Sequence, residues 1–229
     1  MLIISYPSPN FNERQSTARP NIVVIHYTAT RTFEDARATL CNKESKVSAH
    51  YLISEDGTIY RLVNEAKRAW HAGVSKWGSI TDINSYSIGI ELSNDGFSPF
   101  GEKLMISLEL LLDEVLEKWD IPACRVLAHS DVSPGRKIDP GIKFDWDRLA
   151  LKRLCIKPKM LNIKSPNKKD FLKSLGVFGY NTEKPYETLL SAFRMRFNPL
   201  ETGSLTVNDT GLAKALSLEY PVDLHVQDT

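Results

Sequence analysis

Short apolar runs alternate with helix-like patterns along the first two thirds of the chain. Buried strands are predicted where β-branched and apolar residues run together, at 21–27 (NIVVIHY), 86–93 and 124–129. Residues 49–63 alternate between apolar and polar side chains on both sides of Asp56-Gly57, a dipeptide that favours a hairpin turn. Apolar residues every three or four positions predict helices at 33–40, 101–119 and 146–155. This alternation indicates an α/β sheet that includes one hairpin.

The pattern changes beyond this point. Residues 152–169 contain seven Lys or Arg, two Pro and no Asp or Glu, which predicts a linker or a basic strap across the first domain. Three short helices are then predicted, at 168–180, 184–197 and 206–220, with Asn208 as the expected N-cap of the third. About 60 residues are few for an independent core, so we expect these helices to pack on the first domain. The predicted organisation is a domain over 1–156, a linker over 157–169 and a three-helix module over 170–229.

Composition narrows the class of protein. A formal charge of +1 over 229 residues argues against a partner held by a broad basic field, such as nucleic acid. No run approaches the ~20 apolar residues that span a membrane. The three cysteines form no CxxC motif, and buried free thiols are expected. No signal peptide is recognisable at the start, so the residues alone favour the cytoplasm.

The richest polar segment is 127–141 (LAHSDVSPGRKIDPG), which contains two Pro-Gly turns. His129 ends one predicted strand, Asp139 follows ten residues later, and His26 ends another strand. Catalytic zinc takes three protein ligands of these types and leaves its fourth position to water. Each residue taken alone has an ordinary alternative, because a histidine at a strand end often only hydrogen-bonds and an aspartate before Pro-Gly is usually a turn residue. The residues alone leave both readings open.

Five motifs occur in an order typical of one enzyme family: VVIHYTAT, SAHYLISEDGTIYRLV, AWHAG, SIGIELSN and HSDVSPGRKIDPG. Over roughly residues 20–150 the chain resembles zinc-dependent N-acetylmuramoyl-L-alanine amidases of the AmpD/AmiD branch (amidase type 2), which share their fold with peptidoglycan recognition proteins. The segment LLSAFRMRF resembles, more weakly, the helical peptidoglycan-binding module of AmiD-like enzymes. The resemblance implies an α/β fold with a central mixed sheet flanked by helices, followed by a small three-helix C-terminal module.

The resemblance also implies residue roles. It places one zinc ion per chain on His26, His129 and Asp139, with Glu91 as the catalytic carboxylate and Lys137 as its electropositive partner. The residues themselves make Glu91 unusual, because it lies in an apolar strand where glutamate is rarely buried without a partner. A buried structural ion pair is the alternative.

Five other residues receive weaker assignments. Thr28 is expected to line the pocket, and His71 is expected either to contact substrate or to support a metal ligand by hydrogen bonding. Asp131 and Arg136 are expected to pair with each other, shape the loop and orient the neighbouring histidine ligand. His50 is expected to pack and hydrogen-bond under the sheet.

The predicted activity is hydrolysis of the amide between the lactyl group of N-acetylmuramic acid and L-alanine, as in peptidoglycan catabolism and muropeptide recycling. Intact sacculi and soluble muropeptides, including anhydro forms, are all compatible with these motifs. The alternative is a peptidoglycan-binding protein that does not cut; relatives of that kind typically lose a zinc ligand, whereas all are present here. Resemblance to AmiD-type enzymes makes the periplasm or cell envelope plausible.

The C-terminal module allows two interpretations. Phe171, Phe193 and Phe197 are expected in its core, and Arg194 and Arg196 are expected on a basic rim that faces an acidic stem peptide. The module then either tethers the enzyme to polymer or buttresses the first domain. His225, in a polar tail, is expected to have no special role.

Overall fold

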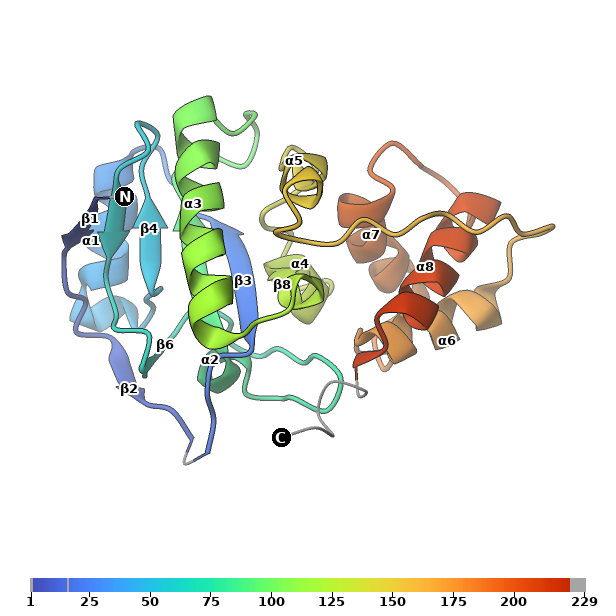
Figure 1. Cartoon of the computed structure of the whole chain (residues 1–229), viewed down its shortest axis with the longest axis horizontal. Helices are drawn as coiled ribbons and strands as arrows, with labels where there is room; N and C mark the ends of the chain where they lie inside the picture. The colour runs from blue at the N-terminus through green and yellow to red at the C-terminus, as the bar shows by residue number, and fades with distance from the viewer. Residues whose placement is uncertain (1, 16, 223–229) are drawn as a thin grey trace.

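The computed structural model describes residues 2–15 and 17–222 and shows a sheet covered by helices on both faces (Figure 1). Six strands form the main sheet in the order β1-β5-β4-β7-β3-β8, and two form a small separate sheet, β2-β6. The main-sheet strands are β1 (Ile3–Ser5), β3 (Ile22–Tyr27), β4 (Tyr51–Ile53), β5 (Ile59–Arg61), β7 (Ser87–Leu92) and β8 (Val126–Ala128). The small sheet consists of β2 (Phe11–Glu13) and β6 (Lys67–Ala69).

The α-helices of the described residues are α1 (Phe33–Cys41), α2 (Ile83–Tyr86), α3 (Glu102–Trp119), α4 (His129–Val132), α5 (Trp146–Leu151), α6 (Lys168–Phe178), α7 (Tyr186–Phe197) and α8 (Val207–Glu219). Two 3-10 turns, η1 (Lys43–Ser45) and η2 (Ala123–Arg125), complete the set. Within residues 2–15 and 17–222 no helix is long and apolar enough to cross a membrane.

The pairing of the strands confirms the predicted mixed sheet. β3 lies between β7 and β8 and is parallel to both, whereas β4 and β5 form the antiparallel hairpin around Asp56-Gly57. In parallel strands the carboxyl ends meet at one edge of the sheet, and side chains there converge. β3, β7 and β8 therefore bring distant parts of the sequence to one place.

Helix α3 covers one face of the sheet. Its apolar residues form a continuous core with fully buried residues of β3 and β7: Val23, Ile25, Ile88 and Ile90. Helices pack on the opposite face of the sheet at two places. Helix α1 packs over Leu52 and Leu62 near the hairpin, and the C-terminal helices α6–α8 pack over β3 and β8.

The C-terminal helices share one hydrophobic core with the sheet, as expected. Ile22 and Val24 of β3 belong to the same buried cluster as Phe171 and Phe193 of α6 and α7. At Gly179 a Cβ atom would lie 2.4 Å from the Trp77 ring, so the two parts approach closely. In Figure 1, α4, β8 and α5 lie between α3 and the C-terminal helices. The boundaries 156/157 and 169/170 stay predictions, and residues 223–229, with His225, lie outside the described residues.

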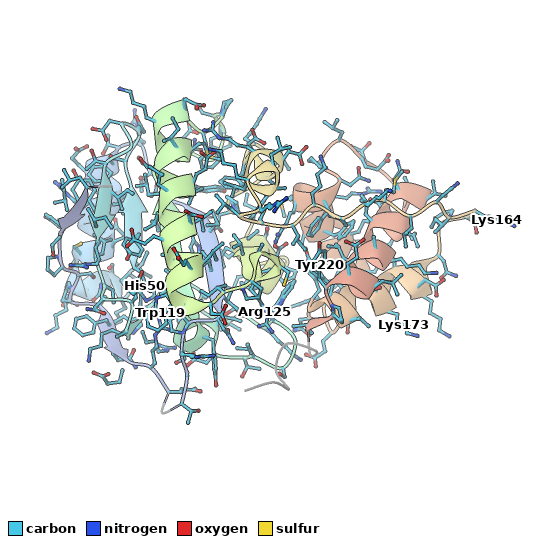
Figure 2. All side chains as sticks on the ribbon, in the orientation of Figure 1. His50, Trp119, Arg125, Lys164, Lys173 and Tyr220 are labelled. Carbon is cyan, nitrogen blue, oxygen red and sulfur yellow. The ribbon has the colours of Figure 1, made fainter. Side chains whose placement is uncertain are left out.

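The linker crosses helix α8 rather than the first domain. A Cβ atom at Gly211 of α8 would lie 2.3 Å from the Leu161 carbonyl oxygen, so only glycine leaves room for the strap. Lys164 and Lys173 lie at the end of the molecule remote from the sheet, whereas Arg125 lies near the boundary between the two parts (Figure 2). The Arg125 side chain donates a hydrogen bond across that boundary to the Val222 carbonyl, at 3.1 Å.

Several local expectations were wrong. The run 124–129 is divided among η2, β8 and the start of α4, and α5 ends at Leu151, short of the predicted end. Thr206, not Asn208, caps α8, because its hydroxyl accepts a hydrogen bond from the Asp209 amide. The three cysteines are free, and Cys41 is only half-buried.

The expected basic rim does not exist. Arg194 and Arg196 are 8% and 5% exposed, and each forms a buried ion pair, with Asp209 and Asp131 respectively. Their charges therefore face the protein interior and not solvent.

Candidate active site

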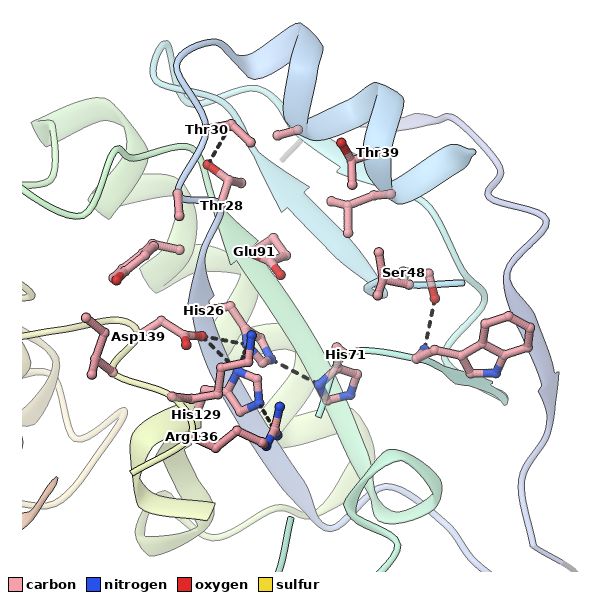
Figure 3. A pocket seen from close by; sticks show the side chains of 18 residues that line it. His26, Thr28, Thr30, Thr39, Ser48, His71, Glu91, His129, Arg136 and Asp139 are labelled. Carbon is pink, nitrogen blue, oxygen red and sulfur yellow. Dashed lines mark hydrogen bonds and ion pairs between the residues drawn. The ribbon is translucent and has the colours of Figure 1, made fainter. Parts of the chain in front are cut away.

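The register between β3 and β7 places His26 and Glu91 side by side. His26 on β3 and Glu91 on β7 are paired across the strands, so both side chains lie on the sheet face opposite α3. His129 begins helix α4 directly after β8, at the same edge of the sheet. Figure 3 shows His26, His129 and Asp139 turned toward one another, with Glu91 beside them and His71 next to His26.

The three predicted zinc ligands form a tight cluster, called here the ligand triad (His26, His129 and Asp139). The His26 Nδ1, His129 Nδ1 and Asp139 Oδ2 atoms lie 2.9 Å from one another along all three edges. All three residues are buried, and their ligand atoms are close enough to hold a metal ion together. The three residues that the resemblance implied as ligands therefore lie together in the structure.

The outer contacts of His129 determine which ring nitrogen carries the proton. Its Nε2 atom lies 3.1 Å from the Ala72 carbonyl oxygen, which only accepts hydrogen bonds. The Arg136 Nη2 atom also lies 3.2 Å from Nε2, but its two hydrogens go to the closer Ala72 carbonyl and Ser133 hydroxyl oxygens. The proton of His129 therefore belongs on Nε2, and the Nδ1 lone pair points into the triad. The Arg136 guanidinium donates to the same carbonyl and holds it in place.

A chain of hydrogen bonds makes the same assignment for His26. The Ser87 hydroxyl donates to the Ile83 carbonyl at 2.6 Å, so it accepts from His71 Nε2 at 3.0 Å. His71 Nδ1 is then an acceptor and receives the His26 Nε2 proton at 3.0 Å. The His26 Nδ1 lone pair therefore also points into the triad.

The triad is a chemical fit for a divalent cation. Two imidazole lone pairs and a carboxylate oxygen converge with no hydrogen between them, an arrangement that a cation between them stabilises. Burial, and then the nearby His129, lower the pKa of His26 to about 4, so it is neutral at pH 7. Two neutral imidazoles and one carboxylate are a typical zinc donor set.

Glu91 stands beside the triad without a structural partner. It is half-buried, yet its Oε2 atom is buried and has no hydrogen-bond partner among the described residues. Burial, and then the negative charge of Asp139, raise its pKa well above the ordinary value, while the Lys137 charge lowers it. Within residues 2–15 and 17–222 Glu91 forms no ion pair within 4.0 Å, so the alternative of a structural ion pair is wrong.

A cavity of about 510 Å³ opens over these groups. Its lining includes the triad, Glu91 and the half-buried Lys137, together with an apolar wall of Leu40, Val47 and Trp70. Thr28 also lines it, with its hydroxyl hydrogen-bonded to the Asn94 carbonyl at 3.3 Å. The cavity thus combines charged groups on the sheet side with an apolar wall on the side of α1.

Two further expectations concern the surroundings of the triad. His50 is fully buried and accepts a hydrogen bond from the Gly89 amide at 3.0 Å, as predicted. The expected Asp131–Arg136 pair is wrong. Arg136 donates to the Val74 carbonyl at 3.0 Å and to the Ser133 hydroxyl at 2.7 Å, while Asp131 pairs with Arg196.

Ser87 and Gly89 are site residues that the sequence reasoning missed. A Cβ atom at Gly89 would lie 2.4 Å from the His71 ring, so only glycine lets that ring lie against β7. A glycine inside an apolar strand was the available signal, because it often marks a close approach. Ser87 carried no such signal.

Fold and site together define the class: a mixed-sheet α/β enzyme with a possible metal site of two histidines and one aspartate beside an unpaired carboxyl group. Comparison with known proteins identifies the enzyme family within this class. The family model described as N-acetylmuramoyl-L-alanine amidase matches residues 16–142. The chain belongs to the N-acetylmuramoyl-L-alanine amidase family.

Individual relatives agree with this. AmiD of Escherichia coli (strain K12) is 32% identical over 90% of this chain and 85% of its own length. The 1,6-anhydro-N-acetylmuramyl-L-alanine amidase AmpD of Haemophilus influenzae is 35% identical, over 62% of this chain and 86% of its own length. The AmiD match is the longer of the two.

Solved structures confirm the fold. The complex of E. coli AmiD with anhydro-N-acetylmuramic acid-L-Ala-D-γ-Glu-L-Lys has a TM-score of 0.81 at 32% identity and covers 92% of this chain and 98% of that chain. AmpDH3 from Pseudomonas aeruginosa, in complex with an anhydromuramic pentapeptide, has a TM-score of 0.79 at 30% identity and covers 97% and 100%. The similarity therefore includes the C-terminal helices as well as the sheet.

Proposed function

We propose that this chain hydrolyses the amide between the lactyl group of N-acetylmuramic acid and L-alanine, with one zinc ion held by the ligand triad. The observation that carries the proposal is the convergence of three ligand atoms, 2.9 Å apart, beside the buried Glu91 oxygen, which has no partner in the described part of the chain. A structural zinc site would satisfy all its ligands from protein, whereas three ligands leave one position open for chemistry.

The proposed substrate is a muropeptide with an N-acetylmuramoyl or anhydro-N-acetylmuramoyl group. Two similar structures contain anhydromuramoyl peptides, and the similarity covers more than nine tenths of this chain in each case. The cavity has room for part of such a ligand, with an apolar wall on one side and the triad on the other. Intact peptidoglycan contains the same amide between the lactyl group and L-alanine, and we propose it as a second substrate.

Glu91 is proposed as the general base and acid. A bound zinc ion supplies a Lewis acid that makes water nucleophilic near neutral pH. The Glu91 carboxylate takes the proton of the attacking water and later delivers it to the leaving L-alanine nitrogen. An amide needs this second step because an unprotonated amine is a poor leaving group. Glu91 Oε2 has no hydrogen-bond partner within residues 2–15 and 17–222, which supports its availability for proton transfer.

Lys137 and His71 are proposed to assist in different ways. The Lys137 ammonium group lines the cavity and is proposed to stabilise the oxyanion that forms on the lactyl carbonyl. Both ring nitrogens of His71 already have protein partners, so we propose that it orients His26 rather than binds substrate. Thr28 keeps its proposed place on the cavity wall.

Product analysis tests this proposal. The purified protein is incubated with a defined anhydromuramoyl tripeptide and, separately, with sacculi, and the products are identified by mass spectrometry. The proposal predicts a free peptide with L-alanine at its amino end and a sugar that retains its lactyl carboxylate. Saturable binding of the muropeptide without any cleavage, in zinc-loaded protein, would instead identify a recognition protein.

A further inference from the structure

The carboxylate of Asp131 lies at the meeting point of the sheet and the C-terminal helices. It is fully buried and lies in α4, two residues after the ligand His129. Its Oδ1 atom accepts a hydrogen bond from the Tyr180 hydroxyl, which follows α6. Its Oδ2 atom accepts from the Arg196 guanidinium of α7, at 2.5 Å. Both of these partners belong to the C-terminal part of the chain.

Arg196 also contacts strand β8 and helix α5 of the first domain. Its second terminal nitrogen donates to the Val126 carbonyl of β8 at 2.9 Å. Its guanidinium carbon lies 4.2 Å from the centre of the Trp146 ring, over its face. One side chain of α7 therefore contacts β8, α4 and α5, and none of these contacts would exist if the C-terminal helices were a free tether.

The same carboxylate also fixes the backbone that carries the ligands. Asp131 Oδ2 accepts a hydrogen bond from the Ala128 amide at 2.9 Å, immediately before His129. The Ser130 amide donates to the Asp139 carbonyl at 3.0 Å, so residues 128–131 also hold the third ligand. A shift of this short segment would move two of the three ligand atoms together.

We propose that Arg196 and Tyr180 are positioning residues for the metal site, acting through Asp131 on the backbone of residues 128–131. This inference rests on the proposed function, because it takes the ligand triad as the metal site. It assigns the C-terminal helices a part in metal affinity that is separate from any binding of polymer. The matched family model ends at residue 142, so neither positioning residue belongs to the family motif.

The chain contains a matched control for Arg196. Arg194 lies on the same helix, is similarly buried and pairs with the fully buried Asp209 at 2.6 Å. Its remaining hydrogen bonds go to the Gly203 and Ser204 carbonyls, within the C-terminal part of the chain. Loss of Arg194 removes a buried ion pair of the same kind and leaves Asp131 with its partners.

The experiment compares full-length wild type with Arg196→Met, Tyr180→Phe and Arg194→Met. Zinc affinity is measured by competition with a chromophoric chelator, and the visible spectrum of the cobalt-loaded protein reports ligand geometry. Thermal unfolding and circular dichroism establish that each variant is folded. We expect Arg196→Met to weaken zinc binding by about tenfold or more and to alter the cobalt spectrum, since partners of metal ligands typically contribute roughly 10- to 100-fold to affinity. Arg194→Met is expected to keep both properties within about twofold of wild type, on the same scale.

The outcomes separate the inference from the proposed function. A folded Arg196→Met protein with wild-type zinc affinity and cobalt spectrum overturns the positioning role, and so does equal weakening by Arg194→Met. If Arg196→Met does not fold, Tyr180→Phe decides: weaker zinc binding supports the role and unchanged binding overturns it. Wild-type protein that binds no zinc, or His129→Ala protein that binds it as tightly as wild type, contradicts the metal site itself.

Discussion

The two faces of the central sheet are built from different chemistry. On the α3 face, β3 and β7 contribute fully buried aliphatic residues such as Val23, Ile25 and Ile90. On the opposite face, the alternate residues of the same two strands include His26, Ser87 and Glu91. A shift of one residue in register would exchange the two sets completely.

This difference shows where the fold gains stability and where it places reactive groups. The face of β3 and β7 that packs on α3 buries aliphatic side chains and so stabilises the sheet. The opposite face contains a carboxylate oxygen without a partner and three converging ligand atoms, which cost stability unless a ligand satisfies them. Substitutions on the two faces should therefore separate into effects on turnover and effects on unfolding.

The largest effect on turnover is expected at Glu91. Glu91→Gln keeps the shape of the side chain but removes the base, so the turnover number should fall by about 10²- to 10⁴-fold. Zinc content and melting temperature should stay at wild-type values. Glu109→Gln is the matched control, because Glu109 is buried on α3 and paired with Arg148 and Lys152. Near-normal hydrolysis by Glu91→Gln would remove this residue from the mechanism.

The next effect is expected at Lys137. Lys137→Ala removes a positive charge from the cavity wall, and turnover should fall by roughly 10²-fold if this charge stabilises the oxyanion. The Michaelis constant for a soluble muropeptide should change much less than the turnover number. Lys143→Ala, an exposed lysine of the same loop, serves as the control. Equal kinetic effects of the two substitutions would show that only the overall charge of the loop matters.

A smaller effect should follow from disturbance of the His71 hydrogen-bond chain. Gly89→Ala introduces a Cβ atom 2.4 Å from the His71 ring and should displace it, weakening zinc binding by roughly 10- to 100-fold. Ser87→Ala removes the hydroxyl that accepts the hydrogen bond from His71 Nε2, and so tests the same series of hydrogen bonds with less steric strain. In contrast, a Cβ at Gly101 would have no neighbour closer than 3.9 Å, so Gly101→Ala is the control. Competition with a chelator measures all three, and unchanged affinity in folded Ser87→Ala and Gly89→Ala proteins would contradict the role of His71.

The smallest effect on activity is expected from the α3 face. Ile90 precedes Glu91 in the sequence, but its side chain lies on the opposite face of the sheet. Ile90→Val removes one methylene group from that side chain. The free energy of unfolding should fall by about 0.5–1.5 kcal/mol, with turnover and zinc affinity unchanged. Urea unfolding and muropeptide hydrolysis measure the two quantities in the same preparation. A loss of turnover comparable with that of Lys137→Ala would show that the two faces are not separable.

The sequence predicted the elements with strong periodicity and missed those without it. α3 has eighteen residues of helical pattern, and β3 and β7 are six-residue strands rich in aliphatic side chains, so their positions followed from the residues. Strands β1, β2 and β6 contain three residues each, as do β4, β5 and β8. However, β4 and β5 lie on either side of a recognisable hairpin turn, and β8 lies within a longer apolar run. The existence of β1, β2 and β6 depends on pairing with distant strands, which no local signal encodes.

In the candidate site, too, the sequence did not reveal side-chain pairs between distant parts of the chain. The ligand triad was predictable because its histidines follow apolar strands and a long motif matches a known family. The partner of Asp131 was not, because Arg136 is five positions away whereas Arg196 is 65 positions away and reaches it only through the packing of α7 on β8. Local proximity suggested a pair, and tertiary structure selected another.

Reconstitution with metal tests the central claim most directly. The protein is stripped with a chelator, shown to be metal-free by mass spectrometry, and titrated with zinc while cleavage of an anhydromuramoyl peptide is followed. Without metal we expect no cleavage, and with added zinc we expect a linear rise of activity that ends at one zinc ion per chain, with no rise in the His129→Ala protein. Full hydrolysis by the metal-free protein would contradict the proposed zinc dependence.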